Sequence, residues 1–138
     1  IDLPSVNIAQ AYFLGCSLPD ARLILSGEQS AFGREEGIRV LSPRHFFEAP
    51  EKYFDVVLNV DSFPEIDTSI STKYLNAMKH TTKYFLSMNH ESMRPLTENK
   101  NHSRVFDLIN KVGGFIRISR HPFWMRRGYA EELYEVKE

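Results

Sequence analysis

The spacing of apolar positions along the chain predicts three helices. Between residues 5 and 17, Val6, Ala9, Phe13 and Leu14 recur at close to the helical repeat, and the preceding Pro4 suits a first helical turn. A second amphipathic stretch covers about 68–80. A third runs over 105–112, where apolar residues fall at i, i+3, i+4 and i+7 and Gly113-Gly114 ends the pattern. Ser103 is a candidate cap for this last helix.

Short apolar runs between these helices predict strands. They cover 21–26, 55–60, 83–89, 115–119 and 132–136, and residues 1–3 resemble the end of another strand. Residues 37–43 are expected to form either a further short strand or an extended connection. The run DVVLNV at 55–60 is almost continuously apolar, as expected for a strand that is covered on both faces. No helix separates the last two strands, so we expect them to form an antiparallel hairpin around a loop at 120–130.

This order of elements predicts an α/β fold. Alternating strands and helices favour a Rossmann-like, mostly parallel sheet with helices on both faces, here with an antiparallel C-terminal hairpin at one edge. A chain of 138 residues is long enough for one domain with a real core, so we expect a single domain over 1–138.

Composition and charge exclude several classes of partner. A net charge of −1 provides no strong field for nucleic acid or an anionic membrane. No apolar run approaches the roughly 20 residues of a membrane span. The one cysteine, Cys16, allows no internal disulfide and is too little for a thiolate zinc site. These features favour a reducing, cytoplasmic location.

Polar side chains gather where the predicted strands end. Asp2 follows the first strand, residues 59–65 follow the strand at 55–60, and residues 89–91 follow the strand at 83–89. In open parallel sheets, ligands bind beyond the carboxyl ends of the strands. The sequence therefore predicts a ligand site at this edge of the sheet.

Several of these residues also have simpler interpretations. Asp2 could cap the helix that follows it, and Asp67 or Thr68 is expected to cap the next helix without touching substrate. His90 is as compatible with a satisfied loop histidine as with a site residue.

Charged and aromatic residues elsewhere favour structural roles. In the loop at 120–130, His121 and Trp124 are expected to pack, and Arg126-Arg127 to be a solvated pair. The aromatic pair in 45–47 is most simply core.

Three motifs together resemble class I S-adenosylmethionine-dependent methyltransferases. They are IDLP (1–4), VLNVDSFPEID (57–67) followed by Tyr74, and YFLSMNHES (84–92). More narrowly they resemble the family called "putative sugar O-methyltransferases". The pattern N-x-D-S-F-x-E is the most specific of the three, and the resemblance covers nearly the whole chain.

The resemblance implies a function and a set of site residues. The function is methyl transfer from S-adenosyl-L-methionine to a hydroxyl of a sugar or glycosylated small molecule. Asp2 would accept hydrogen bonds from the cofactor ribose, residues 42–46 would lie near its adenine, and Asn89 would help to close the acceptor pocket. The implied cofactor-binding residues are Asp2, His45, Phe46 and Asn59, the substrate-binding residues Ser62 and Asn89, and the catalytic residues His90, Asp61 and Glu65.

Catalysis of this reaction needs help at the acceptor oxygen. A sugar hydroxyl is a poor nucleophile, so a general base is expected, with His90 and Asp61 as the candidates. Asp61 or Glu65 could instead orient the sugar. No metal is required by the sequence, although Asp61, Glu65 and His90 could contribute to a divalent site if they converge.

The resemblance also implies a segment that these residues do not contain. A glycine-rich strand–turn–helix for the methionine part of the cofactor should precede Ile1, and no such segment occurs among the seven glycines. We therefore expect the 138 residues to be the C-terminal part of a methyltransferase catalytic domain, incomplete in activity by themselves. Another chain could supply the strand, so a homo-oligomer is possible.

Two other functions stay open at this point. Asp2 would serve an NAD ribose equally well, so another nucleotide-binding enzyme of Rossmann type is the first alternative. The second is a non-catalytic α/β module whose polar strand ends bind a partner.

Overall fold

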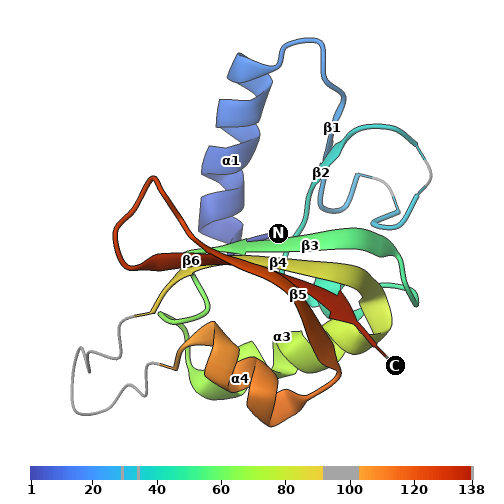
Figure 1. Cartoon of the computed structure of the whole chain (residues 1–138). Helices are drawn as coiled ribbons and strands as arrows, with labels where there is room; N and C mark the ends of the chain where they lie inside the picture. Colours follow the sequence, from blue (N-terminus) through green and yellow to red (C-terminus); the bar gives the residue numbers. More distant parts are fainter. Residues whose placement is uncertain (29, 34, 92–102, 138) are drawn as a thin grey trace. The chain divides into compact units, whose positions relative to one another are not determined.

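The computed structural model describes residues 1–28, 30–33, 35–91 and 103–137 (Figure 1). These residues divide into two compact units, Ile1–Pro50 and Glu51–Glu138. The single domain expected over 1–138 stays a prediction.

The first unit contains a helix, a short parallel strand pair and a helical turn. Helix α1 (Pro4–Ser17) is followed by β1 (Leu23–Leu25), β2 (Ile38–Val40) and α2 (Arg44–Phe47), and β1 and β2 pair in parallel. The predicted helix and both strands are confirmed. The strand predicted at 1–3 is wrong, because these residues form no strand and Pro4 already begins α1. Asp2 N donates to Leu41 O at 3.3 Å, and Leu3 O accepts from Asn7 N at 2.9 Å.

The second unit is a four-stranded mixed sheet with two helices. Its elements are β3 (Phe54–Val60), α3 (Thr68–Thr81), β4 (Thr82–His90), α4 (Val105–Val112), β5 (Phe115–Pro122) and β6 (Tyr129–Val136). The strand order is β3-β4-β6-β5; β3 and β4 are parallel, and β6 is antiparallel to both neighbours. The α/β fold and the antiparallel hairpin at one edge are confirmed, although the hairpin loop is shorter than predicted.

The core of the second unit lies on the face of the sheet that the helices cover. Figure 1 shows α3 and α4 on the same side of this sheet. Phe85 of β4 is fully buried there, and its ring centroid lies 5.9 Å from that of Phe63, 6.1 Å from Tyr134 and 6.2 Å from Phe115. These aromatic contacts fix the central strand, and thereby the strand end at which polar residues gather.

Alternate side chains of β3 are more exposed than the sequence predicts. Val56, Leu58 and Val60 are 52%, 56% and 50% exposed. The prediction that β3 is covered on both faces is wrong for the residues that the structure describes. Here β3 is the last strand of its sheet, and an apolar run indicates what can be buried without identifying the neighbour that would cover it.

Helix ends follow local side-chain chemistry in one case and not in another. Asp67 caps α3, since its Oδ1 accepts a bond from Ser69 N at 2.7 Å. The Ser103 cap is wrong, because Arg104 occupies the cap position of α4 and its Nε pairs with Asp107 Oδ2 at 2.8 Å. Ser103 Oγ lies 3.4 Å from Thr68 Oγ1 instead.

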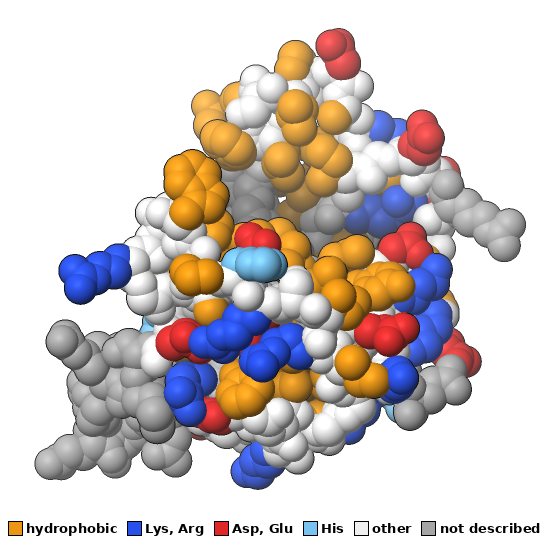
Figure 2. Space-filling view, in the orientation of Figure 1, with side chains coloured by type: hydrophobic (Ala, Val, Ile, Leu, Met, Phe, Trp, Pro, Cys, Tyr) orange, Lys and Arg blue, Asp and Glu red, His pale blue; other side chains and the backbone are white. Residues whose placement is uncertain are grey.

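Helix α1 is apolar and yet none of its residues is buried. Ile8, Tyr12 and Phe13 are among its exposed side chains, and apolar side chains cover the surface of this helix in Figure 2. Within the described ranges, no helix combines the length and the apolar character that crossing a bilayer requires.

Candidate functional site

The carboxyl ends of β3 and β4 lie next to each other because the two strands are parallel neighbours. The chain leaves β3 at Asp61, which adopts a left-handed backbone conformation with φ of 55°. Its N–H donates to Met88 O at 3.1 Å, which anchors this turn to β4. The side chains that follow β3 are thereby directed beside the end of β4.

Three ionisable side chains converge at this point, as the rule for strand ends predicts. One possible ligand atom from each of Asp61, Glu65 and His90 lies within 4.8 Å of the other two. A turn brings Glu65 back toward the strand end, with its N–H donating to Ser62 O at 3.0 Å. Asp61 and His90 are partly buried, and Glu65 is exposed. We call these three residues the acidic–histidine cluster; their catalytic roles stay predictions.

Two residues from the C-terminal hairpin hold the Asp61 carboxylate. Tyr129 Oη donates to its Oδ1 at 2.6 Å and Arg126 Nη1 to its Oδ2 at 2.7 Å. The Tyr129 hydrogen bond lowers the pKa of Asp61 below its usual range, the contacts with Arg126 lower it further, and burial opposes both. Asp61 is therefore a stable carboxylate, suited to accepting hydrogen bonds.

The sequence did not indicate this support for Asp61. Arg126 is exposed, as predicted, but its guanidinium also pairs with Asp61 and lies over the Tyr129 ring, 4.5 Å from the centroid. The antiparallel register of β4 and β6 places Tyr129 opposite His90. Only this long-range pairing brings the hairpin to the site, and residue spacing does not reveal it.

His90 ends β4 and is not a satisfied loop histidine. Its Nδ1 is buried and has no hydrogen-bond partner among the described residues. Its ring meets the Tyr129 ring edge to face, with centroids 5.8 Å apart. The imidazole thus retains unused bonding capacity beside two carboxylates.

Asn59, Ser62 and Asn89 bind one another beneath this cluster. Asn89 Nδ2 donates to Asn59 Oδ1 at 3.0 Å, and Asn89 Oδ1 accepts from Ser62 N at 3.2 Å. Asn59 Nδ2 in turn donates to Ser62 Oγ, and Asn89 is buried. This network holds the turn after β3 against β4. Direct contact of the three residues with cofactor or substrate stays a prediction.

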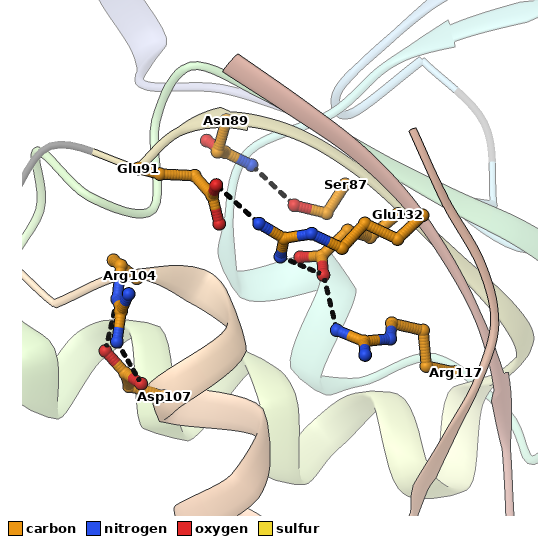
Figure 3. Close-up of polar contacts among 8 residues, drawn as sticks. Ser87, Asn89, Glu91, Arg104, Asp107, Arg117 and Glu132 are labelled. Carbon is orange, nitrogen blue, oxygen red and sulfur yellow. Dashed lines mark hydrogen bonds and ion pairs between the residues drawn. The ribbon is translucent and has the colours of Figure 1, made fainter. Parts of the chain in front are cut away.

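An ion network around one buried glutamate lies on the helix-covered side of the same sheet (Figure 3). Glu132 is only 3% exposed and accepts from Arg120 Nη1 at 2.8 Å and Arg117 Nη1 at 3.2 Å. Arg120 also pairs with Glu91, the residue after His90. The network ties β5 and β6 to the end of β4. Glu132 shares the buried face of β6 with Ala130, Tyr134 and Val136. Sequence reasoning missed the network, because a glutamate is almost never fully buried unless it is paired, and the arginine partners of Glu132 lie on another strand.

The predicted cofactor residues of the first unit show mixed suitability. The Asp2 carboxylate accepts from Leu3 N at 2.8 Å and from Gln10 Nε2 at 3.3 Å. The N-cap position of α1 is held by Leu3, and no side chain caps this helix. Asp2 is therefore not the helix cap. Each of its oxygens accepts one of these hydrogen bonds and keeps a lone pair for a ribose diol.

The aromatic residues of α2 differ in exposure. Phe46 is 4% exposed and belongs to the core, whereas Phe47 is 46% exposed. His45 is also buried, with its Nδ1 3.0 Å from Ser42 Oγ. A stacking role for Phe46 therefore does not fit its burial, and Phe47 offers the more accessible ring.

Comparison with known proteins gives one informative similarity. No protein-family model matches the chain, and no curated protein matches it. Its structure is similar to a crystal structure described as a "putative type 11 methyltransferase" from Sulfolobus solfataricus, with a TM-score of 0.54 and 14% identity over 99% of this chain and 82% of that one. This similarity supports the Rossmann-like fold, and at this identity it shows the fold alone.

Proposed function

We propose that this chain belongs to an S-adenosylmethionine-dependent O-methyltransferase that acts on a sugar or glycosylated small molecule. The observation that carries the proposal is the acidic–histidine cluster, which converges at the carboxyl ends of two parallel strands in a methyltransferase-like fold. This is where ligands bind in open α/β sheets. The choice of a sugar hydroxyl as the methyl acceptor rests on the motif N-x-D-S-F-x-E and on the residues near it.

The chemistry divides among the three residues of the cluster. S-adenosylmethionine, when bound, supplies a methyl group on a sulfonium. The acceptor oxygen forms a bond to that carbon, the carbon–sulfur bond breaks, and the hydroxyl proton must leave. His90 is the base for this proton, because imidazole is the side chain most often used as a general base near neutral pH. Asp61, with its lowered pKa, is too weak a base and orients the hydroxyls instead.

Side chains in and near the acidic–histidine cluster favour a sugar as the acceptor. Two carboxylates, Asp61 and Glu65, can accept hydrogen bonds from neighbouring hydroxyls of a polyol. Trp124 lies on the same β5–β6 loop as Arg126 and is 87% exposed, so its predicted packing role is wrong. An exposed indole offers a flat apolar surface that suits the C–H face of a sugar ring.

Methyl transfer itself is the test. The chain, extended upstream of Ile1, is incubated with methyl-¹³C S-adenosylmethionine and a panel of monosaccharides and glycosides, and products are observed by ¹³C NMR. We expect a labelled methyl on oxygen in at least one sugar. Transfer only to nitrogen or carbon would contradict the hydroxyl assignment, and no transfer to any acceptor would contradict the proposal as a whole.

A further inference from the structure

We propose that Asp61, Glu65 and His90 bind a divalent cation of the Mn²⁺ or Mg²⁺ type. The binding site is defined by the geometry of these residues alone, whereas the role of the cation in catalysis rests on the proposed function. The sequence required no metal, and the convergence of the three side chains is the new observation.

The spacing of the three side chains suits a single ion. Their ligand atoms all lie within 4.8 Å of one another. Ligands on opposite sides of an ion with bonds of about 2.1 Å are about 4.2 Å apart, so small side-chain rotations would bring all three into coordination. Two carboxylate oxygens and one imidazole nitrogen form a mainly hard donor set, for which Mn²⁺ is a suitable ion.

The surroundings of Asp61 are those of a supported ligand. Tyr129 and Arg126 each donate to one of its oxygens, at 2.6 and 2.7 Å. Each oxygen keeps a further lone pair, and outer hydrogen bonds of this kind commonly orient carboxylates that ligate metals. Asp61 is thereby held in one orientation before any ion arrives.

His90 provides an independent indication. Its Nδ1 is a buried nitrogen without a hydrogen-bond partner among the described residues. Leaving a buried polar atom unpaired is costly, so such an atom points to an additional ligand. Coordination of the ring would fix its tautomer and orientation.

A cation at this site would change the roles of the cluster residues in the proposed reaction. It would hold neighbouring hydroxyls of the acceptor and lower the pKa of the one to be methylated, whose proton then leaves to solvent. His90 would be a ligand in that case and not the base.

Mn²⁺ binding tests the cation site directly. The full chain is titrated with Mn²⁺, and the signal of the free ion is followed by electron paramagnetic resonance. We expect one saturable ion per chain, displaced by excess Mg²⁺. Asp61→Asn, Glu65→Gln and His90→Gln should each weaken binding at least about tenfold, and Tyr129→Phe by a smaller factor. Glu135→Gln, at an exposed position of β6, is the matched control and should leave binding unchanged.

Two results would overturn the cation site: no saturable binding at millimolar Mn²⁺, or equal affinity in the wild type and all three cluster variants. Circular dichroism establishes that each variant is folded. Methyl transfer is measured separately, so Mn²⁺ binding without transfer would support the cation site and remove the proposed function. Transfer that persists in a chelator, without Mn²⁺ binding, would do the opposite.

Discussion

Replacing His90 by alanine is expected to lower turnover about 10²–10⁴-fold, whereas the affinity for S-adenosylhomocysteine stays near that of the wild type. His90 lies beside both carboxylates of the cluster, so its loss removes either the base or a ligand on the acceptor side. Asp61→Asn should act in the same direction, because it removes the charge that Arg126 and Tyr129 hold in place. The measurements are kcat with the best sugar acceptor and calorimetric cofactor affinity.

A chelator separates the two roles of His90. If His90 is the base, kcat should persist when divalent cations are chelated, whereas kcat should depend on the added ion if His90 is a ligand. His80→Ala is the control, since His80 is exposed at the end of α3. Near-normal turnover in both cluster variants would remove His90 and Asp61 from the mechanism.

Phe85→Ala should lower the free energy of unfolding by about 3–5 kcal/mol. Phe85 is fully buried at the centre of β4, and three other aromatic rings surround it. Truncation removes buried apolar area and leaves a cavity that these rigid rings fill poorly. Urea denaturation followed by circular dichroism provides the measurement.

An exposed apolar residue of the same sheet provides the control for Phe85. Ile118 of β5 is exposed, so Ile118→Ala should change the free energy of unfolding by no more than about 0.5 kcal/mol. A loss below about 1 kcal/mol for Phe85→Ala would show that the aromatic core on β4 is not the stabilising centre of the second unit.

The elements with strong local patterns were the ones that the sequence predicted correctly. Helices α1, α3 and α4 follow from apolar residues at helical spacing, and Asp67 caps α3 as expected. The rule that ligands gather at strand ends also placed Asp61 and His90 at one edge of the sheet, and the structure brings them together there. Each of these inferences depends on short stretches of chain or on a general property of parallel sheets.

The parts that failed depend on pairing between distant segments. Arg126 and Tyr129 reach Asp61 only through the register of β4 with β6. The mutual bonds of Asn59 and Asn89 were equally hidden, because an amide that binds a ligand and one that binds its neighbour are identical in sequence. The exposed face of β3 was missed for the same reason, since the hydrophobicity of a strand does not reveal whether another element covers it.

The most direct measurement is a calorimetric titration of S-adenosylhomocysteine into this chain and into a version extended upstream of Ile1, with reduced nicotinamide adenine dinucleotide as the rival ligand. We predict saturable binding of S-adenosylhomocysteine to the extended version, weakened by Asp2→Ala, and no binding of the dinucleotide. If neither version bound S-adenosylhomocysteine, or if the dinucleotide bound in its place, the methyltransferase assignment would be wrong. The polar end of β3 would then be better explained as a surface for another ligand or partner.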